Sequence, residues 1–415
     1  MFEPRRRLFS RTLAHGAFCA GARSVGQTPD VSGIAAALGR GYTRYERPAG
    51  YGFATSAEQT HHRISVAEAW RYGATYALRT RSLNAVAYQV GISDTVRPPH
   101  TVEEEAFPEA EFMFLGADRE GLIERSTLER LDALLVWQMP ITWITVQHLS
   151  RCRMVVRYGT GYEKIHIPSL DRAGIAFCNT PDYGTEEVAD TSCGMILNLQ
   201  RRISSYDTAS RKFPVGWQEN VQRPIHRTNS RTLGVIGVGR IGTAVINRMR
   251  GFGFRIVGFD PYQPSGHEKA IGYHRVFTLG KLLSMSDIVS IHCPLNDETR
   301  GLINSETLAL MKRGASLVNT SRGAVIAGFQ CLAEALRTGA LGSVALDVLP
   351  EEPPPAEDPL IAAWRNRESW LDGRLIINPH TAYYSEEALY EMRYKAAETV
   401  RLFLVEGKIR NRIPA

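Results

Sequence analysis

Short apolar runs alternate with polar or helix-like stretches along most of this 415-residue chain. Runs rich in Val, Ile and Leu predict buried strands, and amphipathic stretches between them predict helices. In the first half, strands are expected at 85–90, 111–115, 133–137, 153–156 and 175–178, and helices at 126–131, 143–149 and 167–173. This alternation predicts a small α/β domain with a parallel sheet.

The second half repeats the alternation after a longer apolar helix pattern that starts at Thr191. Strands are expected at 233–236, 255–259, 288–291, 316–318, 344–347 and 375–377. The proline-rich stretch after Asp347 cannot be helix interior or central strand, so it predicts a loop over the sheet edge. A final helix is expected at 386–405, beyond the last strand of this second sheet.

A glycine motif follows the strand at 233–236. Gly237, Gly239 and Gly242 have the spacing G-x-G-x-x-G, which encloses Arg240 and Ile241. The first glycine permits a sharp turn, the second a close approach of a pyrophosphate, and the third close packing of the next helix. The free N–H groups of that helix would then face the phosphates.

Asp260 closes the next strand, where a carboxylate can bind the adenine-ribose hydroxyls and repel a 2′-phosphate. A glycine-rich turn in another kind of βα unit is the simpler interpretation of the motif alone. The preceding strand, the following helix and Asp260 together favour a dinucleotide site that prefers NAD(H) to NADP(H).

Positive charge is concentrated at the start of the chain. The first 83 residues hold 12 Arg, no Lys and 5 acidic residues, a balance of +7, whereas the whole chain carries +6. The remaining residues therefore sum to −1, which gives no indication of a nucleic-acid partner. Six cysteines without a C-x-x-C pair or a His-Cys cluster predict neither a metal site nor a disulfide framework, and they fit a reducing, cytoplasmic environment.

The N-terminal extension admits several interpretations. Arg6 and Arg7 before a weakly apolar stretch suggest a twin-arginine export signal, but His15, Gly16 and the shortness of that stretch argue against it. A disordered basic extension, a transit-like leader and translated sequence upstream of the true start remain open. One helix-like stretch is expected at 65–78, and no apolar run in the chain reaches membrane-spanning length.

Polar residues follow several strands of the second predicted sheet. Arg322 and Asp347 follow two strand ends, Glu352 lies in the proline-rich loop, and His380 follows the last strand. Ligands of doubly wound sheets bind at the carboxyl ends of the strands. An Arg can hold a carboxylate and polarise a carbonyl, and a His oriented by a carboxylate can move a proton. Each residue alone is more simply a surface or loop residue, but their recurrence at strand ends predicts a catalytic site.

These motifs carry a family resemblance. From about Ala85 to its last helix the chain resembles the D-isomer-specific 2-hydroxyacid dehydrogenases, and HTAYYSEEALYEMR most resembles the C-terminal binding protein branch. The resemblance implies a Rossmann NAD-binding domain (191–379) inserted into a smaller flavodoxin-like α/β substrate domain (84–190 and 380–410). It also implies a homodimer joined through the NAD-binding domain, with 1–83 outside the core fold.

The resemblance also implies roles for individual residues. Arg322 matches the substrate-binding Arg, His380 the proton donor and Glu352 its paired carboxylate. Arg157 matches the extra cation of the C-terminal binding proteins. Gly159, Thr160 and Gly161 match the loop whose backbone amides bind the substrate carboxylate. The positions that contact the cofactor in the family match Thr160, Cys293, Thr320 and Asp347.

One position departs from that branch, because Tyr383 stands where the C-terminal binding proteins have a Trp in the substrate pocket. A substrate therefore cannot be taken over from them. Two functions remain: an NAD-dependent D-2-hydroxyacid dehydrogenase acting on a small 2-oxo or 2-hydroxy acid, and an NAD(H)-responsive, corepressor-like scaffold. The intact Arg322, Glu352 and His380 favour the enzyme.

Overall fold

The computed structural model describes residues 87–212, 217 and 225–414. They all belong to a unit that runs from Ser82 to Ala415. The N-terminal extension, including the helix expected at 65–78, lies outside the described residues.

The first sheet has five parallel strands in the order β2-β1-β3-β4-β5. Its strands are β1 (Tyr88–Ile92), β2 (Ala110–Phe114), β3 (Ala133–Val136), β4 (Met154–Arg157) and β5 (Ala176–Asn179). This is the flavodoxin-like order 2-1-3-4-5. The helices that belong to this sheet are α2 (Thr101–Ala106), α3 (Arg125–Leu128), α4 (Trp143–Val146), α5 (Ile167–Arg172) and α14 (Glu386–Glu406).

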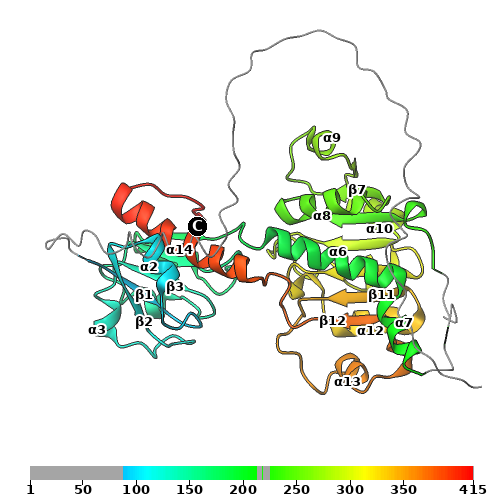
Figure 1. The fold of residues 1–415 in the computed structure, drawn as a ribbon, viewed down its shortest axis with the longest axis horizontal. Helices are drawn as coiled ribbons and strands as arrows, with labels where there is room; N and C mark the ends of the chain where they lie inside the picture. Colours follow the sequence, from blue (N-terminus) through cyan, green and yellow to red (C-terminus); the bar gives the residue numbers. More distant parts are fainter. Residues whose placement is uncertain (1–86, 213–216, 218–224, 415) are drawn as a thin grey trace, which may run out of the picture. The chain divides into compact units, whose positions relative to one another are not determined.

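Alternating side chains of the first sheet enter two cores. In β3, Leu134 and Val136 pack with the side of α3, α4 and α5, whereas Ala133 and Leu135 pack with α14. Helix α14 supplies Met392, Ala396, Val400 and Leu404 to its core and lies beside α2 (Figure 1). The last helix of the chain therefore completes the first sheet.

The second sheet has seven parallel strands in the order β12-β11-β10-β9-β6-β7-β8. They are β6 (Thr232–Ile236), β7 (Arg255–Phe259), β8 (His274–Arg275), β9 (Ile288–Ile291), β10 (Ala315–Asn319), β11 (Leu341–Leu346) and β12 (Leu375–Ile377). Counted from β6, this is the Rossmann order 3-2-1-4-5-6 with one further strand at the far edge.

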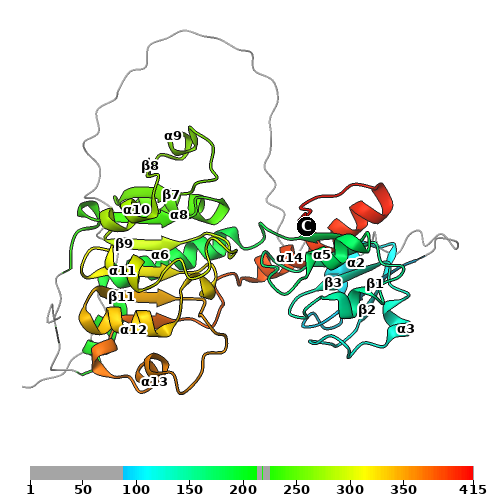
Figure 2. The same ribbon diagram turned by 180° about the vertical axis from the view of Figure 1, so that it is seen from behind.

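Helices cover both faces of the second sheet. One face packs on α6 (Thr185–Arg201) and α8 (Arg240–Arg250), and α6 runs across it in Figure 1. The opposite face, seen in Figure 2, packs on α10 (Leu279–Met285), α11 (Ser305–Ala309), α12 (Phe329–Thr338) and α13 (Pro359–Arg365). The remaining elements are α7 (Ile203–Ser210), α9 (His267–Ile271) and the 3₁₀ turns η1 (Thr228–Ser230), η2 (Gly323–Val325) and η3 (Ser369–Leu371).

The expected fold class is confirmed, and most predicted elements are shifted by only one or two residues. Strand β1 runs on to Ile92 because Val90 and Ile92 are both fully buried. Helix α6 starts at Thr185 rather than Thr191, so the helix spans the predicted domain boundary between residues 190 and 191. The position of that boundary stays a prediction. Helix α2 was not predicted, because TVEEEA shows little apolar periodicity.

A buried ion pair joins α14 to α2. Arg393 donates through Nε and Nη2 to Glu103, at 2.8 and 2.5 Å, and the Glu103 side chain has no exposed surface. The Tyr158 hydroxyl donates to the same carboxylate at 3.0 Å. The carboxylate is therefore neutralised and hydrogen-bonded, as a charge in a core must be.

We expect Arg393→Met to lower the free energy of unfolding by about 3–5 kcal/mol, because the buried Glu103 charge would lose its partner. Denaturant unfolding measures the loss. Arg125→Met is the matched control, because its pair with Glu129 is exposed and should change stability by less than about 0.5 kcal/mol. Equal losses in the two variants would contradict the structural role of the buried pair.

Candidate active site

The glycine loop after β6 is crowded at two glycines and open at the third. Gly237 has φ +84°, and a Cβ there would lie 2.6 Å from the backbone nitrogen of Cys293. A Cβ on Gly242 would lie 2.1 Å from the Gly237 carbonyl oxygen, so the helix α8 could not pack as it does. A Cβ on Gly239 would meet nothing within 4 Å. The loop thus requires glycine for its own geometry at Gly237 and Gly242 and leaves open space at Gly239.

The start of α8 suits an anionic group. Gly239 occupies the N-cap and gives no side-chain cap, so the first N–H groups of the helix are not satisfied by a capping side chain. Arg240 is exposed and Ile241 half-buried in the first turn. Asp260, at the end of β7, accepts a hydrogen bond from the Val238 N–H at 2.8 Å and so lies against the same loop. These residues fit a dinucleotide with its pyrophosphate at α8 and its ribose near Asp260.

Three further predicted cofactor residues follow neighbouring strands. Cys293 follows β9, and its burial raises the pKa of the thiol to about 11, so the sulfur stays neutral. Thr320 follows β10, and its hydroxyl lies 2.7 Å from that of Ser192 in α6. Both side chains are buried and satisfied by packing or hydrogen bonding within the protein.

Asp347, the third, organises the loop that carries His380. Its carboxylate accepts hydrogen bonds from the Thr381 N–H at 3.0 Å and the Ala382 N–H at 3.1 Å, and its carbonyl accepts from the His380 N–H at 2.8 Å. Burial raises the pKa of Asp347, although these backbone hydrogen bonds oppose the shift. His380 has φ +56°, an unfavourable conformation for a non-glycine residue, and these bonds hold it there.

His380 and Glu352 form a close pair. The Nδ1 atom of His380 lies 2.7 Å from Glu352 Oε2, and Glu352 Oε1 accepts from the Leu349 N–H at 2.7 Å. Burial alone would raise the pKa of Glu352, but the hydrogen bonds from His380 and Leu349 and the charge of Arg322 bring it below its ordinary value. The carboxylate therefore stays ionised and orients the imidazole with Nε2 left for a reacting group.

Arg322 is held by two protein groups. Its Nε donates to Glu163 Oε1 at 2.6 Å, and its Nη1 donates to the Ser321 carbonyl at 2.7 Å. The buried Asn319 supports this turn by donating to the Arg322 carbonyl. The third nitrogen, Nη2, lies where a Cβ on Gly161 would be, at 2.0 Å. The guanidinium of the second sheet thus reaches the 159–161 loop of the first.

The same loop makes room for a second guanidinium. A Cβ on Gly159, which has φ +104°, would lie 2.0 Å from Arg157 Nη1. The Gly159 N–H donates to the Thr180 hydroxyl at 2.5 Å, so this amide is not free for a carboxylate as the resemblance implied. Within the described residues, the N–H groups of Thr160 and Gly161 make no hydrogen bond. These two amides lie at the part of the loop that Arg157 and Arg322 approach.

Aromatic rings surround Tyr383. Its ring lies 6.3 Å from the His380 ring, 6.5 Å from Trp137 and 6.1 Å from Tyr183, each approach being edge-to-face. Burial raises the pKa of Tyr183 to about 12, so its hydroxyl stays protonated. Sequence reasoning missed Trp137, Tyr183 and Glu163. For Trp137 a signal existed, since a large aromatic residue ended the predicted strand 133–137; nothing in the sequence marked the other two.

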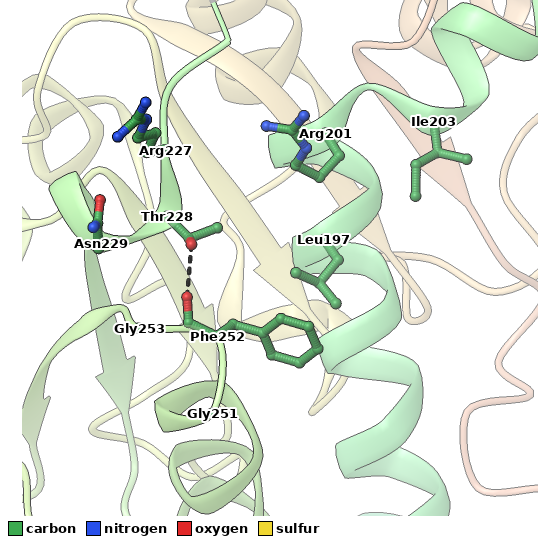
Figure 3. Close-up of a pocket in the computed structure, with 9 residues that line it drawn as sticks. All are labelled: Leu197, Arg201, Ile203, Arg227, Thr228, Asn229, Gly251, Phe252 and Gly253. Atoms are coloured by element: carbon green, nitrogen blue, oxygen red, sulfur yellow. Dashed lines mark hydrogen bonds between the residues drawn. The ribbon is translucent and has the colours of Figure 1, made fainter. Parts of the chain in front are cut away.

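A separate cavity lies away from these residues. It has a volume of about 750 Å³ and lies where β6 and β7 begin, between the end of α6 and the turn after α8. Figure 3 shows the Leu197 and Phe252 side chains pointing toward one another, with Ile203, Arg201 and Arg227 around them. None of the predicted catalytic or cofactor residues lines it.

Residues 87–212, 217 and 225–414 contain no helix long and apolar enough to cross a membrane. Those residues also contain no group of three or more His, Cys, Asp or Glu side chains placed to hold a metal ion.

Known proteins resemble this chain in sequence and in structure. The family model for the D-isomer specific 2-hydroxyacid dehydrogenase NAD binding domain matches residues 193–382. Glyoxylate reductase of Korarchaeum cryptofilum is 36% identical over 285 residues, 68% of this chain and 82% of that protein. C-terminal-binding protein 1 of Caenorhabditis elegans is 32% identical over 284 residues, 67% of this chain but only 38% of that protein. A crystal structure from Polaromonas sp. JS6 66, of a protein assigned to the D-isomer specific 2-hydroxyacid dehydrogenases, has a TM-score of 0.67 at 26% identity and covers 79% of this chain and 100% of that one.

Proposed function

The chain belongs to the D-isomer-specific 2-hydroxyacid dehydrogenase family, and on that premise we propose that it is an NADH-dependent reductase of small 2-oxo acids that also runs in reverse. The observation that carries the proposal is the His380–Glu352 pair, 2.7 Å apart, on a loop fixed by Asp347 at the carboxyl end of the Rossmann sheet. A proton donor with an ionised partner at the ligand-binding edge is what carbonyl reduction requires.

Each residue of the site has a proposed part in the reaction. Arg322 Nη2 and the N–H groups of Thr160 and Gly161 bind the substrate carboxylate. His380 Nε2 gives its proton to the carbonyl oxygen as that oxygen becomes a hydroxyl, and Glu352 stabilises the imidazolium before transfer. The cofactor, when bound, supplies the hydride. Asp260 favours NAD(H), since a ribose 2′-phosphate would be repelled by its carboxylate.

Steady-state oxidation of NADH with a panel of 2-oxo acids tests the activity. We expect turnover with at least one 2-oxo acid, and a loss of about 10²- to 10⁴-fold in kcat for His380→Ala, because the proton donor would be missing. NADH binding, followed by fluorescence titration, should be unchanged in that variant.

The matched control is His274→Ala, an exposed histidine of β8 outside the site, which should keep the wild-type kcat. Undiminished turnover by His380→Ala would remove His380 from the mechanism. If the wild-type protein bound NADH but reduced no 2-oxo acid, the role of an NAD(H)-responsive binding protein would be favoured instead.

A second test removes the carboxylate beside His380. In Glu352→Gln the negative charge that faces the imidazole is gone, so we expect kcat for reduction to fall about tenfold or more while NADH binding is unchanged. Glu351→Gln, the exposed neighbour, should keep the wild-type kcat. Equal kcat values for the two variants would refute the role of the pair.

We further propose a homodimer that buries the cavity of Figure 3. Phe252 is 48% exposed and Ile203 58% exposed beside this cavity, so two large apolar side chains of the second sheet's domain are partly in water here. We expect Phe252→Glu to convert the dimer to monomers at micromolar concentration in sedimentation velocity, because a charge would be buried in the interface. Phe277→Glu, in the bend between β8 and α10 and 81% exposed, should leave the dimer intact. A wild-type monomer, or a Phe252→Glu dimer, would contradict this assembly.

A further inference from the structure

Among the described residues, Glu163 is the carboxylate that forms an ion pair with the proposed substrate-binding arginine, and the family resemblance assigns it no role. It lies two residues after Gly161, in the loop of the first sheet, and accepts a hydrogen bond from Arg322 Nε at 2.6 Å. The two residues are 159 positions apart in the chain. The contact therefore depends on the tertiary fold and not on any local motif.

The contact determines which part of Arg322 can meet a ligand. Glu163 occupies Nε and the Ser321 carbonyl occupies Nη1. Within the described residues, Nη2 has no hydrogen-bond partner, and it lies against Gly161, whose N–H is also without one. Because Nε and Nη1 are hydrogen-bonded to the protein, the guanidinium cannot rotate. Its Nη2 therefore stays beside the loop that carries the N–H groups of Thr160 and Gly161.

Glu163 also places a negative charge beside this loop. Two guanidinium groups approach the loop, Arg157 at Gly159 and Arg322 at Gly161. Within residues 87–212, 217 and 225–414, the Arg157 guanidinium makes no ion pair, and the carboxylates of Glu163 and Asp94 lie within electrostatic range of it. Burial would raise the pKa of Glu163, but the neighbouring arginines bring it below its ordinary value, and it stays ionised. Of these two carboxylates, that of Glu163 contacts Arg322, and its Oε2 lies 2.7 Å from where a Cβ on Gly161 would be.

We propose that Glu163 is a positioning and specificity-determining residue that fixes Arg322 and restricts the site to 2-oxo acids with a single carboxylate. One substrate carboxylate can bind Arg322 Nη2 and the loop amides. The second carboxylate of a 2-oxo dicarboxylic acid would come close to the ionised Glu163 carboxylate beside Arg322 and Gly161, and would be repelled by it. This inference rests on the proposed function, because it concerns the same carboxylate site.

Glu163→Gln separates charge from geometry. The amide oxygen of Gln can still accept from Arg322 Nε, so Arg322 should stay in place while one negative charge is removed. We expect kcat/KM for a 2-oxo dicarboxylic acid such as 2-oxoglutarate to rise about tenfold relative to that for a monocarboxylic acid such as pyruvate, equivalent to ~1.4 kcal/mol. Glu163→Ala removes the acceptor as well, so KM for the monocarboxylic acid should rise about tenfold, and Glu163→Gln should rescue it.

The matched control is Glu124→Gln, which removes one exposed carboxylate from the same part of the chain away from Arg322 and should leave the selectivity ratio unchanged. A binding measurement keeps the inference testable even if no 2-oxo acid is reduced. Calorimetric titration of the NADH-loaded protein with oxamate, a monoanion, and oxalate, a dianion, should show the same tenfold relative gain for the dianion in Glu163→Gln.

The outcomes distinguish the two proposals. Absence of turnover together with the expected shift in anion selectivity would refute the proposed activity and support the role of Glu163. Turnover with an unchanged selectivity ratio in Glu163→Gln, or an equal gain for both classes of anion, would overturn the role of Glu163 and leave the activity standing. The role of Glu163 would also be overturned if Glu163→Gln did not restore the KM of the monocarboxylic acid and if the higher KM of Glu163→Ala were accompanied by a lower melting temperature that explained it.

Discussion

The carboxylate of Asp347 is the group on which the geometry of the site depends most. It is 2% exposed at the end of β11 and binds the N–H groups of Thr381 and Ala382 in the loop that follows β12. Adjacent strands of a parallel sheet end at the same edge, so a short side chain after one strand can hydrogen-bond to the loop that follows its neighbour. These hydrogen bonds hold His380 at its positive φ, with Nδ1 beside Glu352. The resemblance implied a cofactor contact for Asp347, and the structure shows that its carboxylate accepts hydrogen bonds from the backbone of the loop that carries His380.

Much of this edge of the sheet was predictable from the sequence. An apolar run followed by Gly237, Asp260 or Asp347 predicts a strand and also marks the carboxyl end of that strand. The physical reason is that parallel strands buried on both faces read as continuous apolar runs with abrupt polar ends. For the same reason the strand order of both sheets follows from fold class, while helices of only four residues, such as α3 and α4, have blurred bounds because they hold little more than one turn.

Contacts between distant segments were not predictable. Glu163 follows a glycine loop and reads as a solvated charge, and only the approach of Arg322 gives it a partner. The glycines of RYGTG are a related case. Gly159 was expected to offer its amide to a substrate, yet its N–H is taken by Thr180, and what the structure requires at Gly159 and Gly161 is the missing Cβ, which makes room for two guanidinium groups. A sequence pattern specifies glycine without specifying which of its properties is used.

The distribution of these residues along the chain bears on how substrate preference can vary within the family. The match to the NAD-binding domain model, residues 193–382, includes Arg322, Glu352 and His380, and therefore the groups proposed for hydride and proton transfer. It excludes Arg157, Gly161 and Glu163, which lie in and beside the 159–161 loop of the first sheet, where we propose that the substrate carboxylate binds. On this proposal the groups for hydride and proton transfer belong to one sheet, and the charge that discriminates among 2-hydroxy acids belongs to the other. Glu163 contacts Arg322 but neither His380 nor Glu352 by a hydrogen bond, so on this proposal a substitution at Glu163 alters the preferred substrate without altering the groups that move the proton.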